Sequence, residues 1–206
     1  MRIGIFGGSF DPIHHGHLIL AEQCREQAKL DEIWFVPCSL GPHKQDGAHG
    51  TDRQRTEMIE LALSGHLPFV LSKIELERGG VSYTVDTLRQ IRELHPEAEL
   101  FLLMGDDSLE GFDSWREPGE ICELATPLVV NRPGSGDVDL SVLKKYVDEA
   151  RFASFEAAAI SSPFVEISSS NLRSRVGAEK SIRYLTPRSV EKYIETQKLF
   201  VAKDRV

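Results

Sequence analysis

The chain has 206 residues, 41% of them hydrophobic and 27% charged, and its formal net charge is −8. This is an ordinary globular composition, and its acidity excludes sequence-independent binding to nucleic acid, which requires a basic face. The three cysteines show no disulfide or zinc spacing, no run approaches the ~18 apolar residues of a membrane span, and the first ten residues do not resemble a signal peptide. We therefore expect a soluble, cytoplasmic protein that binds neither nucleic acid nor membrane.

Short apolar runs alternate with helical patterns along the chain. The expected strands are Ile3–Phe6, Ile33–Pro37, Phe69–Leu71, Leu100–Met104, Leu128–Val130 and Phe164–Ile167. The expected helices are Gly16–Ala28, Arg55–Leu63, Thr84–Leu94, Leu140–Glu149 and one that is capped at Thr186, has Pro187 in its first turn and ends near Lys198. This alternation predicts a parallel sheet with helices on both faces. We found no repeat or interdomain linker, so we expect a single domain over residues 1–206, with a helical C-terminal part over about 169–200.

Two polar segments interrupt this rhythm. Gly41–Asp52 (GPHKQDGAHGTD) contains glycines and lacks apolar anchors, so it is typical of a surface loop, and it carries Lys44. Asn131–Asp139 (NRPGSGDVD) is a second turn-rich stretch, to which we assign no functional residue.

The most informative stretch is Gly7–His17, GGSFDPIHHGH, between the first strand and the first helix. Open α/β sheets bind ligands at this place, and glycines there let the backbone approach an anion closely. His14 and His17 are three residues apart, so they share one face of the helix N-terminus, where backbone amides favour anions. The spacing and the lack of a lysine exclude a Walker-type loop. A metal site and a purely structural turn remain as alternatives.

A second candidate is Ile167–Arg175, ISSSNLRSR, which follows the last expected strand. Its serines can cap a helix whose free amides face an anion, and the planar guanidinium of Arg173 can bind two phosphate oxygens at once. The alternative is a serine-capped surface helix with a solvated arginine.

Both stretches resemble motifs of the nucleotidyltransferase α/β-phosphodiesterase superfamily. GGSFDPIHHGH is similar to its G-[ST]-F-D-P-x-H-x-G-H signature, and ISSSNLRSR to its I-S-S-T-x-[IV]-R element, with Ser170 replacing Thr and Leu172 replacing a β-branched residue. The resemblance implies a Rossmann-like, doubly wound fold. It also implies that His14 and His17 contact the phosphates of ATP and stabilise the charge on departing pyrophosphate, with His15 at the variable position.

Three further stretches resemble bacterial nicotinate mononucleotide adenylyltransferases: GPHK at Gly41–Lys44, SYTVDTL at Ser82–Leu88 and GDDSLEGFDSW at Gly105–Trp115. The resemblance implies that Trp115 stacks on the pyridine ring. It implies that ATP is bound by Gly7, Gly8, Ser9, Phe10, His14, His17, Gly105, Asp107, Ser169, Ser170 and Arg173. It implies that the mononucleotide is bound by Ser9, Lys44, Tyr83, Thr84 and Trp115, and that catalysis depends on His14, His17, Lys44 and Arg173. The alternatives are a core tryptophan, a bare helix cap at Ser82 or Thr84 and a solvated lysine.

The resemblance implies an adenylyltransferase that transfers AMP from ATP to nicotinate mononucleotide, giving deamido-NAD and pyrophosphate in NAD biosynthesis. Mg²⁺ is expected to enter on the ATP phosphates, without a dedicated protein site. The alternatives are an enzyme that prefers nicotinamide mononucleotide or accepts both, a phosphopantetheine adenylyltransferase and a nucleotide sensor without activity. The sequence leaves a homo-oligomer open.

Overall fold

The computed structural model spans residues 1–206 and describes all of them except 42–47, 132–138, 162, 164 and 202–206; at 106, 107 and 131 it describes the backbone alone. A parallel six-stranded sheet forms its centre, in the order β3-β2-β1-β4-β5-β6. The strands are β1 (Arg2–Gly8), β2 (Glu32–Pro37), β3 (Phe69–Leu71), β4 (Glu99–Gly105), β5 (Thr126–Asn131) and β6 (Ile160–Ser161).

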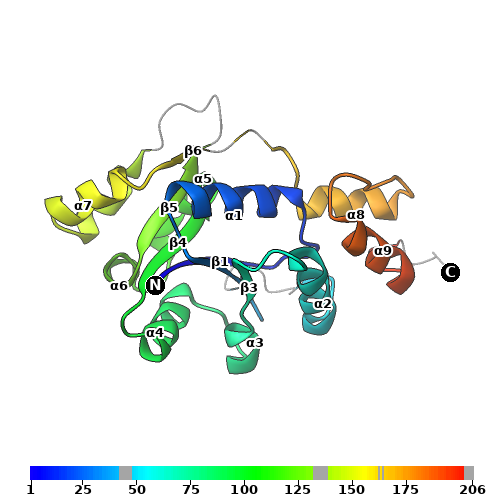
Figure 1. Cartoon of the computed structure of the whole chain (residues 1–206), viewed down its shortest axis with the longest axis horizontal. Helices are drawn as coiled ribbons and strands as arrows, with labels where there is room; N and C mark the ends of the chain where they lie inside the picture. Colours follow the sequence, from blue (N-terminus) through cyan, green and yellow to red (C-terminus); the bar gives the residue numbers. More distant parts are fainter. Residues whose placement is uncertain (42–47, 132–138, 162, 164, 202–206) are drawn as a thin grey trace.

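Helical segments connect the strands and cover both faces of the sheet (Figure 1). They are α1 (His15–Gln27), α2 (Asp52–Leu63), α3 (Ile74–Arg78), α4 (Thr84–Leu94), α5 (Asp106–Glu110), α6 (Pro118–Leu124), α7 (Glu149–Glu156), α8 (Ser169–Gly177) and α9 (Arg188–Gln197), with 3₁₀ turns η1 (Phe112–Ser114) and η2 (Leu140–Tyr146).

Each face of the sheet has its own core. On one face, apolar side chains of α1, α2, α8 and α9 pack together with Phe35 and Leu128 of the strands. On the other, side chains of α4, α6 and α7 pack with Ile5 and Leu102. Two buried faces require strands that are apolar throughout, as the burial of β1, β2 and β4 shows. The predicted Rossmann-like, doubly wound parallel sheet is confirmed.

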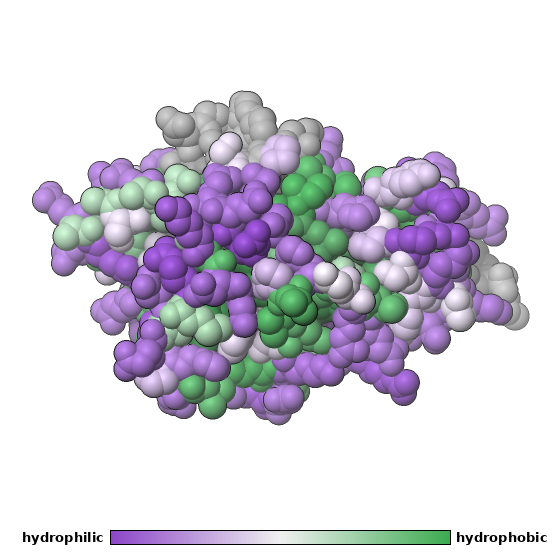
Figure 2. All heavy atoms as spheres, in the orientation of Figure 1, coloured by the Kyte–Doolittle hydropathy of each residue, from purple (hydrophilic) through white to green (hydrophobic). Residues whose placement is uncertain are grey.

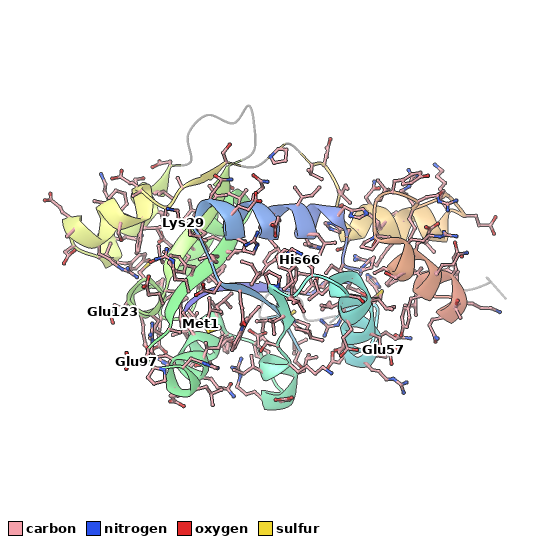
Figure 3. All side chains as sticks on the ribbon, in the orientation of Figure 1. Met1, Lys29, Glu57, His66, Glu97 and Glu123 are labelled. Atoms are coloured by element: carbon pink, nitrogen blue, oxygen red, sulfur yellow. The ribbon has the colours of Figure 1, made fainter. Side chains whose placement is uncertain are left out.

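Side-chain contacts fix the helices around this frame. The hydroxyl of Ser189 on α9 donates to the carbonyl of Leu61 on α2 over 3.0 Å. His66 Nε2, in the loop before β3, lies 3.1 Å from Glu22 Oε2 on α1 (Figure 3).

Most of the surface in Figure 2 is hydrophilic, with apolar atoms gathered in the middle of the face between α1 and α2. Within the described part of the chain, no helix has the length and apolarity needed to cross a membrane.

The last strand was wrongly placed. The edge strand is Ile160–Ser161, which pairs with the end of β5, and no strand forms over 165–167. The side chains of Val165 and Ile167 instead line a cavity beside α1, which explains why an apolar run occurs outside the sheet.

The expected helix Leu140–Glu149 was also wrong. A 3₁₀ turn ends at Tyr146, and α7 begins at Glu149 because the Asp148 carboxylate accepts a hydrogen bond from the backbone N–H of Arg151 over 2.8 Å. At α9 the cap is one residue later than expected. Pro187 occupies the cap, and the Thr186 hydroxyl donates to the carbonyl of Ile13 over 2.8 Å.

Candidate functional site: a phosphate pocket at the carboxyl ends of the central strands

The sheet has its topological switch point between β1 and β4, because the chain leaves β1 toward β2 on one side and leaves β4 toward β5 on the other. Ligands of doubly wound sheets bind at such a point, beyond the carboxyl ends of the strands. A cavity of about 400 Å³ lies here, between the N-terminal ends of α1 and α8. It is lined by Ser9, His14, Gly16, His17, Leu20, Gly105, Val130, Pro163, Val165, Ile167, Ser168, Ser169, Ser170 and Arg173.

The two motif histidines form a stacked pair at the start of α1. Their ring centroids are 3.6 Å apart and their planes differ by 19°. His14 is the residue before the first turn, and its backbone N–H donates to Nδ1 of His17 over 3.2 Å. Because Nδ1 accepts this bond, a neutral His17 ring carries its proton on Nε2. His17 therefore keeps one ring N–H for a ligand.

Both rings are neutral at pH 7 in the ligand-free protein. Burial, and then the charge of His15, lowers the pKa of His14 to about 4. Burial, and then the neighbouring His14, holds the pKa of His17 well below its usual value. His14 Nδ1 is buried without a hydrogen-bond partner among the described residues. The pair thus offers neutral donors and polar atoms to a ligand, while Arg173 supplies a permanent positive charge.

The two motifs, about 155 residues apart, are fastened together. The guanidinium of Arg173 donates to the backbone carbonyl of Asp11 over 2.7 Å and to Ser170 Oγ over 3.3 Å. The Ser169 hydroxyl donates to the carbonyl of Pro12 over 2.9 Å. Through these contacts α1 and α8 direct their N-terminal amides into one pocket. An anion there would be stabilised by the N-termini of both helices.

The space beside the histidine pair is tight at position 16. A Cβ there would lie 3.0 Å from Nδ1 of His14 and 3.5 Å from the carbonyl of Ile167. Any larger residue would press on the buried histidine, so Gly16 keeps space beside the pair.

Arg55 is a supporting residue that we did not foresee. Its side chain is fully buried, and its guanidinium donates to the carbonyl of Ser9 over 2.8 Å, to that of Cys38 over 2.6 Å and to Asp52 Oδ1 over 2.6 Å. It thereby ties the ends of β1 and β2 to α2. The available signal was its position: Arg55 lies three and four residues before Met58 and Ile59, on the buried stripe of the helix.

The pocket contains seven of the residues predicted to bind ATP: Ser9, His14, His17, Gly105, Ser169, Ser170 and Arg173. Gly7 and Gly8, at the end of β1, do not line it. The ring of Phe10 is only 1% exposed and packs edge-on against His17 at 5.1 Å, behind the pair. Lys44 and Arg132 lie outside the described residues, as does the side chain of Asp107. The backbone of Asp107 lies in the first turn of α5, directly after β4.

The predicted pyridine-binding residues lie outside this pocket, on the α4–α6 side of the sheet. Tyr83 and Trp115 are partly exposed and pack against that core, with the Trp115 ring 5.4 Å from Phe112. Tyr83 precedes α4, whose first residue is Thr84, and no side-chain cap bond forms there. The guanidinium of Arg116 lies over the Tyr83 ring at 4.9 Å. The chain therefore separates the phosphate pocket from the residues predicted to bind the base.

A metal site at the histidines is not supported by the donor set. Across the described residues, no cluster of three or more His, Cys, Asp or Glu side chains could hold a metal ion. The described pocket lining offers imidazoles, hydroxyls and a guanidinium rather than carboxylates. A hard cation such as Mg²⁺ prefers oxygen ligands and usually keeps several waters, so the phosphates of a bound nucleotide fit it better than these side chains do.

Residues 5–175 match the model of the cytidylyltransferase-like family. A probable nicotinate-nucleotide adenylyltransferase from Salinibacter ruber is 39% identical, over 97% of this chain and 98% of its own length. One from Geobacillus thermodenitrificans is 41% identical, over 100% of this chain and 88% of its own. The nicotinic acid mononucleotide adenylyltransferase of Plasmodium falciparum, solved in complex with NaAD, has the same fold, with a TM-score of 0.73 at 24% identity and 97% coverage of both chains. Because relatives at these identities align over almost the whole sequence, the chain belongs to the nicotinate-nucleotide adenylyltransferase family.

Proposed function

We propose that this chain joins the AMP part of ATP to the phosphate of nicotinate mononucleotide, releasing pyrophosphate and forming deamido-NAD. One observation carries the proposal: His14, His17, Arg173 and the N-termini of two helices meet in one pocket at the switch point of the sheet. A chain with a net charge of −8 collects its anion-binding groups at this place. Such a local concentration is what binding a triphosphate requires.

The reaction is a displacement at the α-phosphorus of ATP. An oxygen of the mononucleotide phosphate forms the new P–O bond, the bond between the α-phosphorus and the bridging oxygen breaks, and pyrophosphate leaves with the bonding electrons. The attacking oxygen is already ionised at neutral pH, so the protein does not need to remove a proton. Catalysis then consists of aligning two polyanions and stabilising the charge that moves onto pyrophosphate.

The pocket residues can supply both effects. The Nε2–H of His17 is free to donate to a phosphate oxygen, since its Nδ1 accepts from the backbone of His14. Arg173 adds a fixed positive charge and a planar fork of donors. Arg55 does not line the pocket, but it holds the carbonyl of Ser9 and so positions the loop on which the phosphates would rest. Lys44 is retained in this proposal as a further phosphate contact on the strength of the resemblance alone.

Mg²⁺ enters as part of the substrate, on the ATP phosphates, where it offsets the repulsion between the two anions. Carbonyls, hydroxyls and water can complete its coordination shell. We place this reaction in the cytoplasm, consistent with the free thiols of Cys24 and Cys122.

Selection of the base is assigned to the other side of the sheet. Trp115 and Tyr83 offer partly exposed rings near the carboxyl end of β4 and the start of α4. Backbone amides and hydroxyls around Thr84 would recognise the carboxylate of nicotinate, which is the one group that distinguishes it from nicotinamide.

The test is pyrophosphate release with ATP and each mononucleotide in parallel, by the wild-type chain and by Arg173→Gln. We expect turnover with nicotinate mononucleotide, much slower turnover with nicotinamide mononucleotide and loss of most activity in the variant. Arg53→Gln is the matched control, because Arg53 lies on α2 with a side chain that is 86% exposed. No pyrophosphate release with either mononucleotide would refute the proposal.

A further inference from the structure

A second cavity, of about 470 Å³, lies at the amino ends of the strands, on the opposite edge of the sheet from the phosphate pocket. The first residues of β1, β4 and β5 reach it, together with the end of α1, the side chains of Arg151 and Ser154 on α7 and the segment that follows α7. Its lining consists of Arg2, Gln27, Ala28, Lys29, Glu99, Phe101, Thr126, Arg151, Ser154, Ala157, Ala158, Ala159 and Ile160. Figure 3 shows Lys29 at the end of α1 that is nearest to α7. The volume of this cavity is in the range of small-molecule sites.

The charge of this lining is unusual for so acidic a chain. Three side chains, Arg2, Lys29 and Arg151, are cationic, and Glu99 is the only carboxylate among the described lining residues. Glu99 is already engaged, because its Oε2 accepts from Nη1 of Arg2 over 2.8 Å. The lining therefore has an excess of two positive charges.

Arg151 has only neutral partners among the described residues. Its Nε and Nη2 donate to the carbonyl of Cys122 over 3.2 and 3.0 Å, and its Nη1 donates to the hydroxyl of Thr126 over 3.2 Å. Burial lowers the pKa of this guanidinium. A partly buried cation without a counter-ion is costly, and an anion in the cavity would remove that cost.

Arg2 is held rigidly beside the same cavity. Its Nη2 donates to the carbonyl of Ala28 over 3.1 Å, and its guanidinium lies 4.6 Å from the centre of the Phe101 ring. Its Nε is buried and has no hydrogen-bond partner among the described residues. Arg151 is fixed in the same way, with its guanidinium 4.9 Å from the ring of Phe155. Two pre-positioned guanidinium groups bind an anion with little loss of side-chain freedom.

The volume and the lining of the cavity indicate the class of this anion. Arg2 begins β1 and Arg151 bonds to Thr126 at the start of β5, so the two guanidinium groups come from either side of β4. A cavity of about 470 Å³ has room for more than one acidic group alone. Phe101, Ile160 and the alanines 157–159 add an apolar surface suited to a ring.

From these observations we propose that the cavity at the amino edge of the sheet is a second binding site, which takes a small organic phosphate of about mononucleotide size. The phosphate would lie against one guanidinium, and a ring with polar edges would extend toward the other. This site shares no lining residue with the phosphate pocket, and the proposal is independent of the reaction assigned there.

AMP is the probe for the test, and hydrogen exchange of α7 is the local readout, since AMP also fits the phosphate pocket. We expect AMP to slow exchange over Glu149–Glu156 in the wild-type chain, and calorimetry to find two AMP sites. In Arg151→Gln the protection of α7 is lost or its apparent affinity falls about 10- to 100-fold, the usual range for a hydrogen bond to a charged group. Turnover with ATP and nicotinate mononucleotide stays unchanged in this variant.

Two further variants keep the test decisive. Lys29→Gln changes an exposed side chain, so it does not endanger folding, and it should weaken the α7 response in the same direction as Arg151→Gln, by a smaller factor. Arg53→Gln removes one positive charge elsewhere and should leave the response unchanged. Wild-type protein that binds AMP at a single site, with no protection of α7 at millimolar AMP, would overturn the proposal.

Discussion

The phosphate pocket and the predicted base-binding region are built in different ways. In the pocket, Ser169 and Arg173 donate hydrogen bonds of 2.9 and 2.7 Å to the backbone carbonyls of Pro12 and Asp11, far away in the sequence. The histidine pair is held locally, by the 3.2 Å bond from the backbone N–H of His14 to Nδ1 of His17. Around Tyr83 and Trp115, the rings are partly exposed and the nearest charges form surface ion pairs. Arg89, for example, pairs with Asp86 at 3.1 Å and also with Glu117 and Glu120.

This difference shows which half of the site is formed before substrate arrives. Partly buried hydrogen bonds to backbone carbonyls hold a side chain in one geometry, whereas exposed ion pairs contribute little to stability. The phosphate pocket therefore has its donors in place in the ligand-free protein. We expect the residues predicted to bind the base to contribute surface and selectivity, and to acquire their full contacts only with the mononucleotide.

The largest effect is expected at His17. Removing its ring in His17→Ala should lower kcat by ~10²–10⁴-fold, because a donor to the developing charge on pyrophosphate is lost. The fold should survive, since the ring lines a cavity. The control is His15→Ala, which removes the neighbouring imidazole outside the pocket lining and should leave kcat nearly unchanged. Equal activity of the two folded variants would remove the histidine pair from catalysis.

Selection between nicotinate and nicotinamide tests the region predicted to bind the base. We expect kcat/KM for nicotinate mononucleotide to exceed that for nicotinamide mononucleotide by at least ~10²-fold, because a site built to hydrogen-bond one group strongly rejects an analogue that lacks it. The KM for ATP should be the same with both. Equal kcat/KM values would instead identify an enzyme that accepts either base.

Acid should weaken the fold through His14. Its pKa is about 4 in the folded chain and 6.5 ordinarily, so between these values the unfolded chain binds a proton that the folded chain does not. The contribution of His14 to the free energy of unfolding is thus complete above pH 6.5. Roughly 3 kcal/mol of it is lost as the pH falls toward 4. Urea unfolding at a series of pH values should show a shallower decline in His14→Asn than in the wild type. Parallel curves would mean that His14 is not buried as a neutral ring.

The smallest effect is expected for Trp115→Ala, which should raise KM for either mononucleotide by about tenfold through loss of ring stacking. Binding of ATP should be retained, because Trp115 does not line the phosphate pocket. Phe69→Leu, in β3 and packed against the core on the other face of the sheet, is the control for general loosening of the protein. An unchanged KM in Trp115→Ala would place that ring in the core alone.

The sequence predicts the parallel sheet from the alternation of apolar runs with helical patterns. It predicts the two motifs that line the pocket from local residue types and a specific resemblance. It does not predict features that depend on tertiary contacts. Arg55 belongs to an ordinary helical pattern, and its role appears only where the ends of β1 and β2 meet α2. β6 has two residues and is fixed by pairing with β5, so no periodic signal marks it. Phe10 resembles a ligand contact in the motif, but packing places its ring behind His17.

The separation of the two base-side rings from the pocket is equally invisible in the sequence. Tyr83 and Trp115, like His14, belong to recognisable sequence motifs. A motif does not reveal how far a side chain lies from the pocket before the ligand binds. Their predicted contacts with the pyridine remain predictions, as do those of Lys44 and the Asp107 side chain.

The most direct test of the central claim, that a neutral histidine pair meets the phosphates of ATP, is nitrogen NMR of the histidine rings. In the free enzyme at pH 7 we expect His17 to be neutral, with its proton on Nε2 and an acceptor Nδ1. Addition of MgATP should shift the Nε2 resonance of His17, while the resonances of His15 stay in place. A protonated His17 in the free enzyme, or His17 resonances that do not change at saturating MgATP, would contradict the account.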